Sequence, residues 1–222
     1  ENFFAITVRE NGSEEIYIHE PGALKGKKVQ LPEDEHSIGI NDDLEYFSKF
    51  IRISYQSLIT PRIVFDYDVE KGTFKTRKKQ DVPGWNKKGY VSERVWVKNG
   101  DVKVPVILVR AKKVKLDGKA PMLLEAYGSY GISSDPYFSI SKLSLLKRGW
   151  IIALAHPRGG GEMGWHWHKE ARLLTKHRTY EDMIAVAEYL QKHKYTSADR
   201  IALMGGSAGG MLVGAVLNMR PD

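Results

Sequence analysis

The residues best suited to covalent chemistry lie in "RIALMGGSAGGMLVG", residues 200–214, where Ser207 stands between glycines. An apolar strand and a helix of small residues flank the serine, which is the context that the G-x-S-x-G motif requires. Glycine two residues to either side prevents collisions around a strained nucleophile. We predict that Ser207 is a nucleophile and that the Ala208 N–H, at the helix start, stabilises an oxyanion. The alternatives are a packing turn or a phosphate loop, but the lysine and the glycine spacing of phosphate loops are missing.

The elements that must position Ser207 alternate between apolar strands and a helix. Strand-like segments are "SERVWVK", "VPVILVRA", "PMLLEAY", "GWIIALAH" and residues 200–204. A helix is predicted to start at a capping signal, Thr179 with Asp182 three residues on, and to continue through "MIAVAEYL". This alternation predicts an open α/β sheet with its site at the carboxyl ends of the strands.

The preceding residues, up to about Pro83, follow a β pattern. Asn11-Gly12 between two short apolar segments is typical of a hairpin, and further strands are predicted within residues 46–57 and 62–79. Aligning Ile16 with Ile63 gives a repeat of 47 residues, in the range of propeller blades. A plain antiparallel meander is the alternative. We place the domain boundary so that residues 1–83 and 84–222 form two domains.

Composition excludes several classes of function. The chain has 222 residues, a net charge of +7 and no cysteine, which excludes disulfides and thiolate chemistry and agrees with a reducing compartment. Its lysines are scattered, which favours a solvated face over a nucleic-acid patch. We find no membrane-length apolar run and no leader signal, so we expect a cytoplasmic protein. His166 and His168 have no carboxylate at metal-site spacing, and we expect no metal and no cofactor.

Three ordered motifs, "YGSYG", "RGGGEMGWHWH" and "GGSAGGMLVGAVLNMRPD", resemble those of the prolyl oligopeptidase family of serine peptidases, and within it the oligopeptidase B branch most. The resemblance is strong over residues 84–222, and the β half fits the end of the family's propeller. It implies the N-terminal portion of an α/β-hydrolase domain preceded by the last blades of a β-propeller. It also implies cleavage of short peptides, after lysine or arginine, through an acyl-enzyme on Ser207.

The same resemblance implies roles for further residues. The Tyr127 hydroxyl would be the second oxyanion donor, with Tyr130 as the fallback; a buried packing role for Tyr127 is the alternative. Asp135 matches the first of two acidic residues that recognise a basic substrate side chain, and Tyr137 occupies the second position. An ordinary turn role for Asp135 stays equally open. Arg158 with Glu162 would brace the glycine loop, with phosphate binding as the alternative.

A serine nucleophile needs a histidine base held by a carboxylate, and in α/β-hydrolases both follow the serine. All seven histidines precede Ser207, and Asp222 is the only acid after it. We therefore expect the sequence to end inside the catalytic domain and to lack efficient peptidase activity by itself. The alternative functions are an esterase or thioesterase of the same family and a non-catalytic interaction protein.

Overall fold

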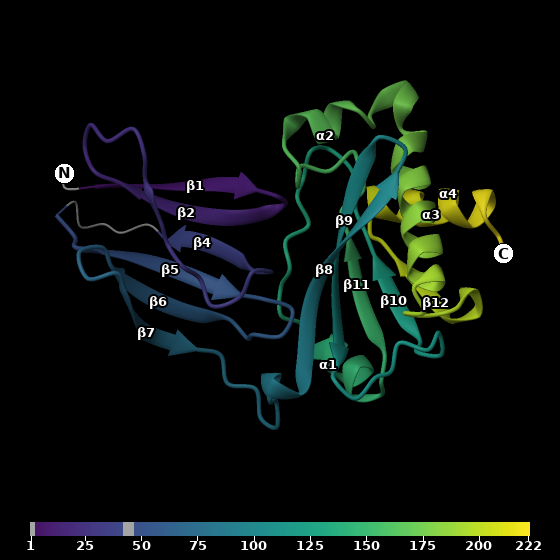
Figure 1. Cartoon of the computed structure of the whole chain (residues 1–222), viewed down its shortest axis with the longest axis horizontal. Helices are drawn as coiled ribbons and strands as arrows, with labels where there is room; N and C mark the ends of the chain where they lie inside the picture. The colour runs from purple at the N-terminus through teal and green to yellow at the C-terminus, as the bar shows by residue number, and fades with distance from the viewer. Residues whose placement is uncertain (1–2, 42–46) are drawn as a thin grey trace. The chain divides into compact units, whose positions relative to one another are not determined.

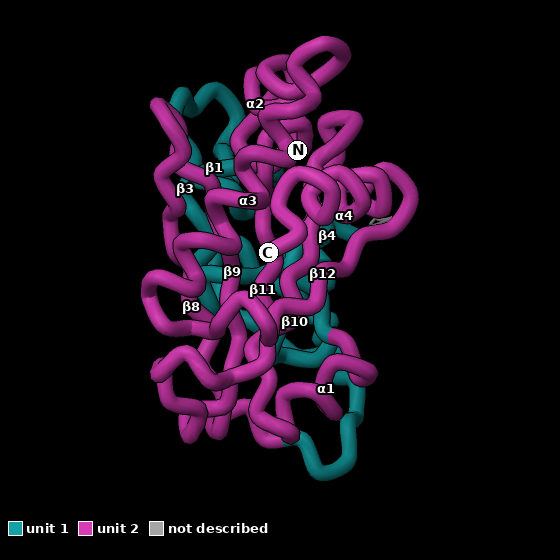
Figure 2. The backbone as a smooth tube through the Cα atoms, turned by 90° about the vertical axis from the view of Figure 1, so that its right-hand side faces the viewer, with its two compact units in different colours: residues 1–85, 135–138 teal, residues 86–134, 139–222 magenta. Residues whose placement is uncertain are grey.

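The computed structural model describes residues 3–41 and 47–222, so Tyr46, the first residue of one predicted strand segment, lies outside it. The chain forms two compact units (Figures 1 and 2). Unit 1 contains residues 1–85 and 135–138, and unit 2 contains residues 86–134 and 139–222. Residues 135–138 thus belong to unit 1, although they lie within the stretch that the sequence pattern assigns to the catalytic domain.

Unit 1 is built from two antiparallel sheets, one with the order β1-β2-β3 and one with the order β4-β5-β6-β7. The strands are β1 (Phe4–Glu10), β2 (Ser13–His19), β3 (Lys27–Lys28), β4 (Ser37–Asn41), β5 (Phe50–Gln56), β6 (Ile63–Asp68) and β7 (Thr73–Lys79). The predicted hairpin is confirmed: Asn11 and Gly12 join β1 to β2 with φ values of 50° and 87°. Positive φ at both positions is what a two-residue I′ turn requires.

The two sheets of unit 1 repeat one arrangement. Ile16 lies in β2 and Ile63 in β6, and each of these strands pairs with the strand that follows it, β3 or β7. The 47-residue period therefore joins equivalent strands. Buried side chains from both sheets form one apolar cluster, consisting of Ile16, Ile18, Val29, Ile51, Ile53 and Tyr67. In β5 these buried residues alternate with more exposed ones, as in a strand with one face on the core.

Unit 2 contains a five-stranded sheet with the order β12-β10-β11-β9-β8. Its strands are β8 (Tyr90–Asn99), β9 (Val102–Ala111), β10 (Met122–Glu125), β11 (Ile151–Ala155) and β12 (Ile201–Met204). β10 is parallel to both β11 and β12, whereas β9 is antiparallel to β11 and β8. Every residue of β11 is buried, as expected for an inner strand of a sheet that is covered on both faces.

The helices of unit 2 are α1 (Ile140–Lys147), α2 (Trp165–Lys169), α3 (His177–Lys192) and α4 (Ala208–Met219). Helices α3 and α4 contact each other, and both contribute buried side chains to the main core beside the sheet (Figure 1). Helix α1 packs on β9 and β11. Within residues 3–41 and 47–222, no helix has the length and apolar character needed to cross a membrane.

The predicted start of α3 is wrong. The helix begins at His177 with Lys176 as its N-cap, so Thr179 and Asp182 lie inside it, and both are fully buried. The Thr179 hydroxyl donates a hydrogen bond to the Arg158 carbonyl, and Asp182 accepts hydrogen bonds from Arg158. The two residues that resemble a capping pair are therefore used for tertiary contacts.

Candidate active site

The carboxyl ends of three parallel strands meet at one edge of the unit 2 sheet. β10 ends at Glu125, β11 at Ala155 and β12 at Met204, and the Ala126 N–H donates to the Met204 carbonyl at 3.3 Å. The segments that continue from these ends carry Tyr127, Arg158 and Ser207. The sheet therefore brings together three segments that the sequence motifs single out, at the edge where open α/β sheets bind ligands.

Ser207 lies at the turn between β12 and α4. Its side chain is exposed and its backbone has φ 53° and ψ −119°, a strained conformation for a residue with a side chain. A Cβ atom at Gly205 would lie 2.2 Å from the Gly209 carbonyl oxygen, and one at Gly209 would lie 2.7 Å from the Ala126 carbonyl oxygen. These close backbone approaches require glycine at both positions. They are the physical reason for the two glycines of the G-x-S-x-G motif.

Ala208 is the first residue of α4, a helix of 12 residues. The N–H groups of a first helical turn have no partner within the helix, and the helix dipole adds positive potential there. The Ala208 N–H therefore has the chemistry of an oxyanion donor beside Ser207. Its role in catalysis stays a prediction.

The half-buried Tyr127 lies against the first turn of α4. A Cβ atom at Gly209 would be 3.5 Å from Tyr127 Cδ2, so the phenol ring packs directly beside the turn that carries Ser207. Tyr130 is 71% exposed, and its ring centroid is 6.5 Å from that of Tyr127. The structure thus shows the Tyr127 ring beside the turn of Ser207, and the role of its hydroxyl as the second donor stays a prediction.

The glycine loop after β11 is held by Arg158 through Asp182 of α3. Asp182 Oδ2 accepts hydrogen bonds from the Arg158 backbone N–H and from Nε, both at 2.9 Å, and Oδ1 accepts one from Nη2 at 2.7 Å. The Asn99 amide donates to the same Oδ1 at 2.7 Å. The Asp182 carboxylate raises the pKa of Arg158, so the buried guanidinium stays charged.

Glu162 holds the glycine loop to the loop that precedes α1, through Ser134. Its Oε1 accepts a hydrogen bond from the Ser134 N–H at 2.9 Å, while Arg158 pairs with Asp182. Asp182 is the residue that sequence reasoning missed in this role. The available signal was a carboxylate on the apolar face of the predicted helix, where an unpaired charge would be costly.

The glycine loop packs backbone to backbone against the segment that carries Tyr127. A Cβ atom at Gly159 would lie 2.2 Å from the Gly128 carbonyl oxygen, and one at Gly161 would lie 2.2 Å from that of Gly131. The Gly131 N–H also donates to the Gly159 carbonyl at 3.0 Å. Consecutive glycines after Arg158 are thus explained by close packing of two loops.

Asp135, the predicted binder of basic side chains, is paired with Arg9 inside unit 1. Arg9 Nη1 and Nη2 donate to its two carboxylate oxygens at 2.7 and 3.1 Å, and Arg9 Nη2 lies 3.0 Å from Glu14 Oε1. Burial and the nearby Asp135 charge raise the pKa of Glu14. Tyr137 is half exposed. The structure places the Arg9 guanidinium on Asp135, and the substrate role of this carboxylate stays a prediction.

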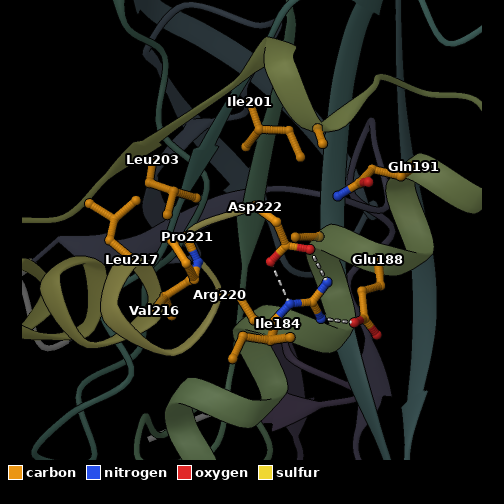
Figure 3. Close-up of a pocket in the computed structure, with 12 residues that line it drawn as sticks. Ile184, Glu188, Gln191, Ile201, Leu203, Val216, Leu217, Arg220, Pro221 and Asp222 are labelled. Atoms are coloured by element: carbon orange, nitrogen blue, oxygen red, sulfur yellow. Dashed lines mark hydrogen bonds and ion pairs between the residues drawn. The ribbon is translucent and has the colours of Figure 1, made fainter.

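A hollow lies between α3, β12 and α4, and Ser207 is not among the residues that line it (Figure 3). Its wall includes apolar side chains from all three elements, such as Ile184, Leu203 and Val216. Arg220 crosses it, with Nε and Nη2 donating to Asp222 at 2.8 Å each, and it also binds Glu188.

As for metals, the described part of the chain contains no group of three or more acidic, histidine or cysteine residues that could hold an ion.

Comparison with protein families agrees with this architecture. The model of the prolyl oligopeptidase family matches residues 136–222, and the model of the prolyl oligopeptidase N-terminal β-propeller domain matches residues 1–80. The chain is 43% identical over 224 residues to dipeptidyl aminopeptidase BI of Pseudoxanthomonas mexicana, covering 100% of this chain and 31% of the relative. It is 35% identical over 221 residues to a prolyl endopeptidase of Elizabethkingia meningoseptica, covering 99% of this chain and 31% of that enzyme.

A solved structure of oligopeptidase B from Leishmania major is similar to nearly the whole chain. The TM-score is 0.90 with 36% sequence identity, and the match covers 99% of this chain and 32% of that structure. The chain thus spans about a third of the length of the relatives it matches. It belongs to the prolyl oligopeptidase family, with the end of a β-propeller followed by the start of an α/β-hydrolase domain.

Proposed function

We propose that the full-length gene product is a serine peptidase that cleaves short peptides through an acyl-enzyme on Ser207. One observation carries the proposal. In a chain of this family, an exposed serine with φ 53° follows a parallel strand, and the glycines two residues before and after it, Gly205 and Gly209, leave no room for a side chain. That is the arrangement of a nucleophile elbow.

The proposed reaction has two steps. Ser207 Oγ attacks the peptide carbonyl carbon while its proton passes to a histidine base, and the amine leaves with that proton as the acyl-enzyme forms. Water then attacks the ester carbon and releases the acid. In each step the Ala208 N–H and the Tyr127 hydroxyl would stabilise the oxyanion. No histidine follows Ser207 in this chain, so the activity is proposed for the full-length product.

The finer part of the proposal is cleavage after lysine or arginine. Similar proteins carry names that imply different specificities: a dipeptidyl aminopeptidase, a prolyl endopeptidase and an oligopeptidase B. Asp135 supports a basic preference, since a carboxylate that already binds the Arg9 guanidinium through both oxygens has suitable geometry for such a group. A substrate side chain would have to share Asp135 with Arg9 or displace it.

The nucleophile is tested by labelling with a fluorophosphonate probe. We expect the full-length protein to be labelled at Ser207, as located by peptide mass spectrometry, and the Ser207→Ala variant to remain unlabelled and inactive. Ser57, a buried serine of unit 1, provides the matched control, because Ser57→Ala should retain labelling. Labelling that persists in Ser207→Ala, or a wild-type protein that is never labelled, would contradict the proposal.

Specificity is tested with fluorogenic peptide amides that differ only in the residue before the scissile bond. We expect kcat/KM to be higher for the arginine and lysine substrates than for the proline substrate. Asp135→Asn should reduce the preference for arginine and lysine over proline. Equal turnover of the proline series would leave the peptidase proposal standing but remove the basic preference. Turnover of matched esters without any amide hydrolysis would instead identify an esterase.

A further inference from the structure

Lys176 is a half-buried amine that contacts the loop following Tyr127. It is the N-cap residue of α3, and its Nζ donates hydrogen bonds to the Gly128 carbonyl, to Ser129 Oγ at 2.8 Å and to Thr179 Oγ1 at 3.1 Å. Three acceptors match the three protons of an ammonium group. The amine is therefore fully used in one fixed geometry.

All three acceptors of Lys176 are neutral oxygens. Within the described residues, no carboxylate forms an ion pair with Nζ, and burial lowers the pKa of Lys176 to about 8. Keeping a cation in such surroundings costs free energy, and hydrogen bonds offset only part of it. A surface lysine at a helix start would avoid this cost, so the position of Lys176 indicates a specific task.

The loop that Lys176 binds cannot hold its shape through regular secondary structure. Residues 126–134 contain no strand or helix, and Gly128, Tyr130 and Gly131 all have positive φ values. The loop is tied to β12 through the Ala126 N–H and to the glycine loop through the Gly131 N–H. Lys176 binds the loop between these two hydrogen bonds, at Gly128 and Ser129, which directly follow Tyr127.

We propose that Lys176 is the positioning residue for Tyr127, holding the loop so that the phenol points to the place where the oxyanion forms. This inference rests on the proposed function. Oxyanion donors contribute because they are already in place when charge develops, and a displacement of 1 Å can cost about 10²-fold in rate. An oxyanion donor acts on charge that develops in the transition state, so loss of Lys176 is expected to change kcat and to leave KM nearly unaltered.

The test is a double-mutant cycle in the full-length protein with a peptide amide substrate. Tyr127→Phe should lower kcat by about 10²–10³-fold. Lys176→Met should lower kcat by about 10–100-fold with KM changed less than about threefold, and the double variant should be no slower than Tyr127→Phe alone. Lys192→Met is the control, because this exposed lysine at the far end of α3 should have wild-type kinetics.

A milder substitution keeps the inference testable if Lys176→Met does not fold. Ser129→Ala removes one acceptor of Lys176 and should lower kcat about threefold, again only while Tyr127 is present. Amide hydrogen exchange over residues 127–131 should quicken in Lys176→Met and stay unchanged in Lys192→Met. This second measurement does not depend on activity.

Three results would overturn the inference. The first is that the effects of Lys176→Met and Tyr127→Phe on kcat multiply in the double variant. The second is that Lys176→Met has a kcat within twofold of the wild type. The third is that Lys176→Met changes KM alone. If the wild-type protein itself neither reacts with the fluorophosphonate probe nor cleaves peptides, the proposed function fails and this inference fails with it. An active, labelled wild type with a normal Lys176→Met variant removes the inference alone.

Discussion

Each unit holds an aspartate bound by more than one donor, but the two surroundings differ. In unit 1, Asp66 of β6 accepts hydrogen bonds from Arg52 and Arg77, whose side chains are 52% and 41% exposed. In unit 2, Asp182 binds Arg158, whose side chain is 10% exposed, and Asp182 itself is fully buried. Water screens the first cluster and hardly reaches the second.

The two clusters also hold different kinds of structure. Asp66 and its partners lie on β5, β6 and β7, whose backbones are already paired in the sheet. Arg158 lies in a glycine loop with little regular secondary structure, and Asp182 joins that loop to α3. The Asp66 cluster therefore adds to a sheet that backbone hydrogen bonds already hold, whereas the Asp182 cluster fixes the position of a loop at the candidate site.

The largest effect is expected from breaking the buried cluster. Asp182→Ala removes both short hydrogen bonds to the Arg158 side chain and leaves this buried charge with only the more distant Glu170 as an ionic partner, which costs about 3–5 kcal/mol. We expect a lower melting temperature of the full-length protein, faster hydrogen exchange over residues 158–162 and strongly reduced activity. Glu170→Gln is the control, because Glu170 is more exposed and lies 3.7 Å from Arg158. Equal losses in both variants would show that burial does not distinguish these contacts.

A second test compares glycines in the two units. Gly205→Ala would place Cβ 2.2 Å from a backbone oxygen, so we expect destabilisation of about 1–3 kcal/mol and loss of Ser207 labelling. At Gly206 in the same turn and at Gly39 in β4 of unit 1, an added Cβ would have no atom within 4 Å, and neither residue has positive φ. Alanine should be tolerated at both. Retained labelling in Gly205→Ala would mean that the turn can open without loss of function.

The smallest effect is expected at Asp66, whose carboxylate is buried but whose arginine partners are largely exposed to solvent. Arg52 and Arg77 lower the pKa of Asp66 below its ordinary value of 3.8. Its ionised form thus contributes stability that is complete above about pH 4 and is lost as pH falls through the folded pKa. Asp66→Asn should cost about 1 kcal/mol at pH 7, because its partners are solvated, and less near pH 3. Denaturant unfolding followed at both pH values measures this, and a pH-independent difference would rule out the ion pairs as its cause.

The sequence predicted those features that depend on neighbouring residues. The Asn11-Gly12 hairpin and the Ser207 turn both follow from local backbone requirements, and the structure has the expected conformations at each. Thr179 and Asp182 were misassigned because a capping pair and a tertiary pair can have the same spacing. Asp182 is 24 residues from Arg158, and Asp135 is 126 residues from Arg9. Spacing rules for helices and turns carry no information about such partners.

The strand order of unit 2 has a consequence for how the nucleophile is assembled during synthesis. β8 and β9 are joined by a short turn and can pair as soon as both have left the ribosome, whereas β12 pairs with β10 across α1, β11 and α3. Contacts between distant residues form later, since the intervening chain must first be ordered. We therefore expect pulse-labelling hydrogen exchange to protect β8 and β9 before β12. Ser207 would acquire its reactive conformation only when β12 pairs with β10. Until then, the nascent chain carries the serine without a working site.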